Sequence, residues 1–226
     1  MAGMHLPPST SRTPCPSPCP SPSPSPSRIA GLVLAAGAGS RYGRPKALVH
    51  DAAGRSWLQH AVNVLAAAGC SPVIVVLGAR GAEAAALIEP TPSVLVVQAA
   101  DWADGLSASL RAGLRAALDL STVAAVAIIP VDVPDVNAAT VARVIGANID
   151  GTGTDAAVGM LRQARFAGRP GHPVVIGRAH WVPLLDTVAG DTGAGPYLRA
   201  HAAQAIECGD LGTGHDRDLP EATDPA

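Results

Sequence analysis

Cationic side chains and three glycines follow a short apolar run near the start of the chain. The run ends at Leu34, and the next twelve residues read AAGAGSRYGRPK and end at Lys46. Gly37 and Gly39 have no Cβ, so their backbone amides can come close to phosphate oxygens. Arg41 and Lys46 bring fixed positive charge, which suits a polyphosphate and the charge that develops on it during transfer. The loop therefore predicts a phosphate-binding site after a buried strand, where ligands bind in open α/β sheets.

The spacing within this loop excludes two familiar phosphate motifs. Gly37, Gly39 and Gly43 read G-x-G-x-x-x-G, whereas a dinucleotide-binding fingerprint requires G-x-G-x-x-G. A Walker loop ends in Gly-Lys-Ser/Thr, whereas this loop ends in Gly-Arg-Pro-Lys. A flexible surface turn is the remaining alternative, but cations interleaved with glycines after a buried strand favour a binding loop.

A carboxylate suited to metal binding lies later in the chain. Asp132 follows the apolar run 126–129 and stands between Pro130 and Pro134. An Asp at the carboxyl end of a buried strand is well placed to bind Mg²⁺ beside phosphates. The alternative is an Asp that caps the following helix, and this role fits Asp135 better than Asp132.

Apolar runs and helical periodicity alternate along most of the chain. Runs that favour buried strands lie at 29–34, 73–77, 94–97 and 126–129, and near 155–160 and 173–177. Segments with helical features lie at 56–68, near 81–88, from about 105 to 118, near 136–147 and near 193–202. This alternation with short connections predicts an α/β fold, with a doubly wound, mainly parallel sheet and helices on both faces.

Composition and charge restrict the partners. The 226 residues carry a formal net charge of −2, so the chain lacks the basic surface that nucleic acids or anionic membranes require. No apolar run reaches the roughly 20 residues of a membrane span, and the N-terminus lacks the apolar core of a signal peptide. Four scattered cysteines do not form a disulfide framework. We therefore expect a cytoplasmic protein that binds neither nucleic acid nor membrane.

The first 28 residues have a different composition from the rest. Pro alternates with Ser or Cys from Pro14 to Pro26, which removes backbone donors and favours extended geometry. A docking segment for a proline-recognition domain is one interpretation, but composition favours a disordered extension. We expect a disordered Pro/Ser-rich tail at 1–28 and a single domain at 29–226.

The loop from Leu34 to Lys46 resembles the L-A-A/G-G-x-G/S-x-R-x-G-x-x-K signature of the nucleotidyltransferase A-like superfamily. Within it, the chain is most similar to molybdenum cofactor cytidylyltransferases and the MobA-like NTP transferase family, from about Ile29 to Ala222. The resemblance implies a Rossmann-like nucleotidyltransferase fold, with Arg41 and Lys46 as catalytic cations. It also implies that the nucleotide is bound by Leu34, Ala35, Ala36, Gly37, Gly39, Ser40, Lys46, Ser107 and Ser109.

Shorter segments support these assignments. WADGLSASLRAGL resembles the family's W-x-x-G-M/L-x-x-S-L-x-x-G-L segment, which lies near the nucleotide and contains Ser107 and Ser109. Ser as a plain helix cap is the alternative. PVDVPD resembles the D-Q-P or D-x-P step, which makes Asp132 a Mg²⁺ ligand. DRDLPE resembles the closing D-I-D-T-P segment, which makes Asp218 the second metal contact, with Asp216 as runner-up; the alternative is a hydrophilic tail.

Two further segments concern the acceptor. RPGHP resembles the family's G-H-P turn beside the acceptor pocket and implies that His172 contacts the acceptor; a polar loop residue is the alternative. GDTGAG resembles a G-D-x-G-A-R segment, in which Asp191 is either an acceptor contact or a helix N-cap. Gly195 stands where the family has Arg, and Val133 stands where Gln is common, so neither position supplies those contacts.

The resemblance implies Mg²⁺-dependent transfer of CMP from CTP to molybdenum-loaded molybdopterin, with release of pyrophosphate. A molybdoenzyme or its maturation chaperone is a candidate protein partner. A guanylyl or sugar-phosphate nucleotidyltransferase is the alternative within the class, and a catalytically silent carrier of nucleotide or cofactor is the alternative outside it. Guanylyl-type relatives have Gly where this chain has Ala36, and a Cβ there leaves less room for a purine, which predicts CTP over GTP.

Overall fold

Seven strands form one mixed sheet in the computed structural model, which describes residues 28–146 and 154–219. Residues 1–27 of the expected tail lie outside these residues, and Arg28, its last residue, begins the first strand. The strands, in chain order, are β1 (Arg28–Ala35), β2 (Val73–Leu77), β3 (Val94–Gln98), β4 (Val123–Pro130), β5 (Leu161–Phe166), β6 (Arg169–Gly177) and β7 (Gln204–Glu207). Their spatial order is β3-β2-β1-β4-β6-β5-β7. This confirms the predicted α/β fold and its mainly parallel sheet.

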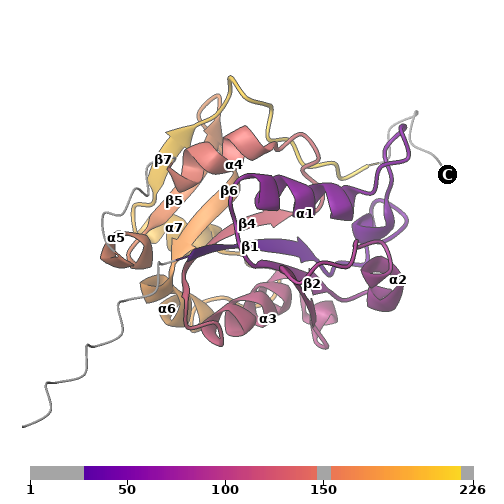
Figure 1. The fold of residues 1–226 in the computed structure, drawn as a ribbon, viewed down its shortest axis with the longest axis horizontal. Coiled ribbons are helices and arrows are strands. Elements are labelled where there is room, and N and C mark those ends of the chain that lie inside the picture. Colours follow the sequence, from indigo (N-terminus) through magenta and orange to yellow (C-terminus); the bar gives the residue numbers. More distant parts are fainter. Residues whose placement is uncertain (1–27, 147–153, 220–226) are drawn as a thin grey trace, which may run out of the picture.

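Helices cover both faces of the sheet (Figure 1). The helices α1 (Trp57–Ala67) and α4 (Ala138–Ile145) lie on one face, and α3 (Leu106–Leu118) and α6 (Trp181–Leu185) lie on the other. The shorter helices are α2 (Gly81–Ala85), α5 (Thr154–Val158) and α7 (Gly195–Ala200). Short 3-10 turns lie at η1 (Lys46–Leu48), η2 (Trp102–Asp104) and η3 (Arg178–His180). Among the described residues, no helix combines the length and the apolar character that crossing a membrane would require.

The alternation of side chains along β1 explains the two-faced packing. Ile29 and Val33 belong to the buried cluster under α1 and α4, whereas Ala30 and Leu32 belong to the cluster under α3 and α6. Successive side chains of a strand point to opposite faces, so an uninterrupted apolar run is buried on both sides. The apolar runs at 29–34, 73–77, 126–129 and 173–177 form inner strands of the sheet, and the run at 94–97 forms the edge strand β3, whose side chains are partly exposed.

One strand runs against its neighbours. Within the described residues, β6 is antiparallel to both β4 and β5, whereas β3-β2-β1-β4 and the β5–β7 pair are parallel. Because β6 is antiparallel to β4, the start of β6 lies at the edge of the sheet where β4 ends. The turn that contains His172 therefore reaches the same edge as the loop that follows β1.

The predicted strand near 155–160 is wrong. Residues Thr154–Val158 form the helix α5, and the strand β5 begins only at Leu161. A short apolar run is compatible with either structure, and periodicity alone does not separate them. The capping role suggested for Asp135 is also wrong, because the side chain of Asn137 caps α4 by accepting a hydrogen bond from Thr140 N at 3.0 Å.

Candidate functional site

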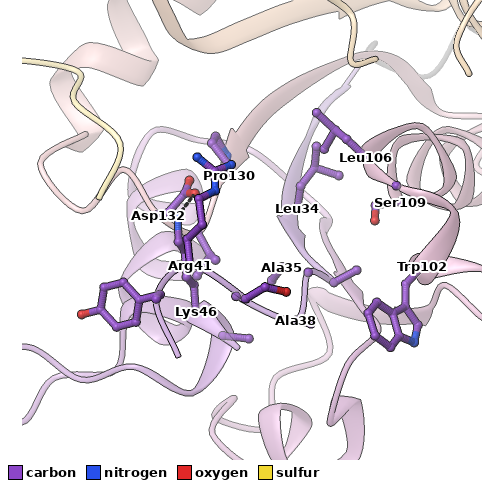
Figure 2. A pocket seen from close by; sticks show the side chains of 18 of the residues that line it. Leu34, Ala35, Ala38, Arg41, Lys46, Trp102, Leu106, Ser109, Pro130 and Asp132 are labelled. Carbon is purple, nitrogen blue, oxygen red and sulfur yellow. Dashed lines mark hydrogen bonds and ion pairs between the residues drawn. The ribbon is translucent and has the colours of Figure 1, made fainter. Parts of the chain in front are cut away.

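The largest group of predicted site residues lines one cavity, of about 440 Å³, at the carboxyl ends of β1 and β4. Figure 2 shows side chains from the first loop, from the start of α3 and from the end of β4 converging on it. The predicted residues that line this cavity are Leu34, Ala35, Ala36, Gly37, Gly39, Ser40, Arg41, Lys46, Ser109, Asp132, Asp191 and Asp218. Segments far apart in the sequence thus meet where a parallel sheet typically binds its ligand.

Two glycines of the loop have different physical roles. Gly39 has a φ of +66°, and a Cβ on it would lie 1.9 Å from the carbonyl oxygen of Arg44, so no other residue fits there without moving the loop. Gly43 N donates to Gly39 O at 2.8 Å and closes the turn. A Cβ on Gly37 would meet no protein atom within 4 Å. Gly39 therefore sets the loop's shape, whereas Gly37 leaves free space beside the cavity.

Lys46 lies between two carboxylates at the mouth of this cavity. Its Nζ donates to Oδ2 of Asp132 at 2.8 Å and to Oδ1 of Asp218 at 2.9 Å. Arg41 Nη1 donates to Oδ2 of Asp218 at 2.8 Å from a side chain that is 78% exposed. Arg41, Lys46 and Asp132 are seen together in Figure 2. The structure thus places the two predicted cations beside the two predicted metal ligands.

The electrostatics of this cluster shift the pKa values of Lys46 and Asp218, and both shifts favour the charged form of the side chain. Burial alone would lower the pKa of Lys46, but hydrogen bonds and charges from Asp132 and Asp218 raise it above its ordinary value. The hydrogen bond from Lys46, with the charges of Lys46 and Arg41, holds the pKa of Asp218 below its ordinary value. Near neutral pH the site therefore contains an ammonium and a carboxylate, both ionised.

The donor set fits a hard divalent cation that is completed by its substrate. No group of three or more His, Cys, Asp or Glu side chains gathers as a metal site within the described residues. Mg²⁺ usually binds one or two carboxylates and takes its other ligands from water and phosphates. Asp132 and Asp218, which already share one cation in Lys46 Nζ, meet that requirement.

A second cavity, also of about 440 Å³, adjoins the first and shares Leu34, Leu106, Pro130 and Asp132 with it. Its other lining is largely apolar, with Gln163, His172 and Asp216 as polar exceptions and no Lys or Arg among the described lining residues. Asp132 therefore stands on the boundary between the two cavities.

His172 lines the second cavity, as predicted for the acceptor side, with an unusual environment. Its Nδ1 is buried and has no hydrogen-bond partner among the described residues. Burial lowers the pKa of His172, although the Ile128 carbonyl and the charges of Asp132 and Asp216 act in the opposite direction. The lowered pKa favours the neutral imidazole, and its Nδ1 is left unpaired among the described residues.

Three of the predicted site residues lie elsewhere than the sequence motifs indicated, relative to the two cavities. Ser107 is fully buried, and its Oγ accepts from Arg111 Nη2 at 3.1 Å, so it lies outside the first cavity. Asp191 lines the first cavity and not the second, and it does not cap α7, whose N-cap is Ala194. Asp216, the runner-up to Asp218, lines the second cavity.

The fold and this site together define an α/β protein with a glycine-rich loop after its first strand and a cavity at the carboxyl ends of β1 and β4, where open α/β sheets bind their ligands. More narrowly, residues 31–205 match the family described as the MobA-like NTP transferase domain, and the chain is a member of that nucleotidyltransferase family. The match confirms the family and the enzyme class that the sequence predicted.

The similar proteins in this family include one named as an oxidoreductase and several solved structures from mycobacteria. The nicotine blue oxidoreductase of Paenarthrobacter nicotinovorans is 36% identical over 196 residues, which cover 85% of this chain and 93% of that protein. The crystal structure of an Rv0371c homologue from Mycobacterium sp. strain JC1 is 25% identical, with a TM-score of 0.66 over 86% of this chain and 92% of that one. Rv0371c of Mycobacterium tuberculosis H37Rv in complex with manganese shares the fold at 24% identity, with a TM-score of 0.57 over 87% and 92% of the two chains.

Proposed function

We propose that this protein transfers CMP from CTP to a phosphorylated acceptor, molybdenum-loaded molybdopterin, and releases pyrophosphate. The observation that carries the proposal is the position of Lys46, between Asp132 and Asp218 at the mouth of the glycine-loop cavity. Asp132 also borders the adjoining cavity, so an NTP in one cavity and an acceptor in the other would meet at this carboxylate.

The residues of the chain would act by alignment and charge. Amides of the loop around Gly37 and Gly39 would hold phosphate oxygens, and Lys46 and Arg41 would neutralise the charge that develops on the α-phosphate and on the departing pyrophosphate. The acceptor phosphate is already anionic near neutral pH, so no general base is required. A divalent cation held by Asp132 and Asp218, Mg²⁺ in this proposal, would supply further neutralisation of phosphate charge. The manganese complex of the mycobacterial protein supports a divalent cation.

The second cavity supports an acceptor whose ring system is uncharged. Its apolar lining suits a flat ring, and the free Nδ1 of neutral His172 suits a hydrogen bond to a ring heteroatom. The pterin of molybdopterin has these properties, and its phosphate would point toward Asp132. A molybdoenzyme or its maturation chaperone is the partner that this product implies, and the cytoplasm is the compartment in which such exchange takes place.

Pyrophosphate release measured with CTP or GTP and the molybdenum-loaded pterin tests the proposal. We expect a higher kcat/KM with CTP, because Ala36 lines the first cavity and a residue with a Cβ at this position should leave less room for a purine than glycine does. Ala36→Gly should narrow the CTP:GTP ratio without abolishing activity, since one methyl group decides only about 1–3 kcal/mol of discrimination. A wild-type preference for GTP would refute the cytidylyl assignment and leave the guanylyl alternative. Nucleotide binding without any pyrophosphate release would indicate a silent carrier.

The similarity to nicotine blue oxidoreductase supports a second candidate, a redox reaction on a planar dye-like substrate bound in the apolar cavity. This candidate predicts that nicotine blue loses its visible absorbance when the protein is mixed with the dye and NADH or NADPH. It also predicts no pyrophosphate release with any NTP. The same preparation tested in both assays separates the two functions, with Lys46→Met as the variant that should lose only the nucleotidyl transfer.

A further inference from the structure

The last described segment of the chain crosses back over the site. Residues 208–219, which we call the strap, leave β7 and run to the carboxyl end of β4 with almost no regular secondary structure. Arg217 N donates to the backbone oxygen of Asp132 at 2.9 Å, and the next residue, Asp218, places its carboxylate on Lys46. One of the two carboxylates at the site is therefore carried by a segment that is itself neither helix nor strand.

Asp135 holds the middle of the strap. Its Oδ2 accepts hydrogen bonds from Thr213 N at 2.7 Å, from Thr213 Oγ1 at 2.5 Å and from Gly214 N at 3.0 Å. Its Oδ1 is buried without a hydrogen-bond partner among the described residues, which is unfavourable for a carboxylate. The three bonds to the strap are therefore what stabilises Asp135 in this position.

The backbone of the strap is closely packed where Asp135 binds it. Gly214 has a φ of +62°, and a Cβ on it would lie 2.2 Å from the ring of Phe166. Asn137, two residues after Asp135, donates from Nδ2 to the carbonyl oxygen of Leu211 at 2.8 Å. The loop that follows β4 thus binds the strap at 211, at 213–214 and at 217, and the path to Asp218 is fixed along its whole length.

We propose that Asp135 is a positioning residue for Asp218, an inference that rests on the proposed function through the metal role of Asp218. Asp132 and Asp218 are like charges that must lie close enough to share one metal ion, and their mutual repulsion opposes this arrangement, with the charge of Lys46 offsetting it while no metal is bound. Asp135 opposes that repulsion by holding the backbone four residues before Asp218. One short loop, 132–135, therefore supplies the first carboxylate directly and fixes the second through the strap.

Binding of Mn²⁺ to the full-length protein in the presence of CTP, followed by the EPR signal of free Mn²⁺, tests this role. Asp135→Ala should weaken Mn²⁺ about tenfold or more, as loss of a group that orients a metal ligand typically does. Its kcat should fall while the KM for CTP changes little, because the glycine loop is untouched. Asp135→Asn keeps an oxygen that accepts from Thr213 and should recover most of the affinity. Asp210→Ala, which removes only the strap's pair with Arg143, is the matched control and should match the wild type.

A double-mutant cycle separates positioning from a general effect on stability. In an Asp218→Ala background, Asp135→Ala should weaken Mn²⁺ no further, because Asp135 acts only through Asp218. An equal loss in both backgrounds, or wild-type Mn²⁺ affinity in Asp135→Ala, would overturn the inference. Hydrogen exchange at the Arg217 amide, which Asp135→Ala should accelerate and Asp210→Ala should not, gives an independent reading. If Asp218→Ala alone leaves Mn²⁺ binding unchanged, the proposed metal role fails, and the exchange measurement still decides the positioning.

Discussion

At the scale of the residue, the site depends on opposite charges held close together. Lys46 is only 13% exposed and touches two carboxylates, so it offsets their mutual repulsion while no substrate is bound. In the proposed function, a phosphate that enters the cavity would compete with the carboxylates for this ammonium, and a divalent cation would compete with the ammonium for the carboxylates. Lys46, Asp132 and Asp218 therefore suit both the empty site and the site with phosphate and metal bound.

Asp132→Ala is expected to reduce turnover by several orders of magnitude with little effect on stability. The carboxylate lies at a strand end and contacts Lys46, which keeps Asp218 as a partner, so the loss of one partly exposed pair changes the free energy of unfolding by about 1 kcal/mol or less. Pyrophosphate release and a thermal melt measure the two effects. Glu83→Gln, which removes an exposed pair with Arg80 outside the lining of both cavities, is the control. A parallel loss of activity and melting temperature would instead make Asp132 a structural residue.

His172 predicts a pH dependence of stability. Its folded-state pKa is lowered, chiefly by burial, so below its unfolded-state pKa of about 6.5 the unfolded chain binds a proton that the folded chain does not. The contribution of neutral His172 is therefore present above about pH 6.5 and is lost as the pH falls toward the folded-state value. Melting temperatures recorded from about pH 7.5 to 5 should fall more steeply in the wild type than in His172→Gln. Parallel curves would show that His172 titrates equally in both states.

At the scale of the element, two glycines in the loop between β1 and η1 have different roles. Gly39 sets the backbone conformation of the loop, and Gly37 leaves open space beside the cavity. Gly39→Ala should disturb the loop, because its φ is positive and a Cβ would collide with Arg44. Gly37→Ala should leave the melting temperature unchanged and weaken nucleotide binding, because its Cβ would meet no protein atom and would occupy space beside the cavity. Calorimetric titration with CTP and Mg²⁺, paired with thermal melts, distinguishes the two. Equal CTP affinity in Gly37→Ala and the wild type would mean that the nucleotide keeps away from this backbone.

Elements with a strong local signal could be predicted from the sequence, and elements defined by tertiary contacts could not. The buried strand β2 and the helix α1, with its Ser56 cap, appear where the apolar pattern placed them. The edge strand β7 is largely exposed and has no apolar run, and the reversed direction of β6 depends on pairing with β4. In the site, the glycine loop and Asp132 each lie in a recognisable local motif, so both could be predicted from the sequence. The hydrogen bond from Thr213 to Asp135 joins residues 78 positions apart, and no local pattern indicates it.

At the scale of the whole molecule, the site lies at the carboxyl ends of β1 and β4, within a sheet whose seven described strands come from residues 28–207. The alternating Pro/Ser segment before Arg28 contains few groups that could be buried, and composition predicts that it does not pack on the domain. Deletion of residues 1–27 should therefore leave both the melting temperature and the turnover unchanged. A drop of more than a few degrees in a thermal melt would show that the segment packs on the domain. Slower turnover at an unchanged melting temperature would indicate a role at the site.

The strap also has a consequence for the order in which the protein matures on the ribosome. All seven strands and Lys46 precede Asp218 in the chain, so translation delivers the whole sheet before it delivers the second carboxylate. A nascent chain halted after β7 has the cavity and one of its acidic groups, but lacks the segment that completes the pair. With Asp218 as the proposed second metal ligand, premature termination in this region is expected to produce a protein that binds nucleotide without turning it over. If that protein keeps the sheet intact, quality control that recognises only misfolding would not remove it.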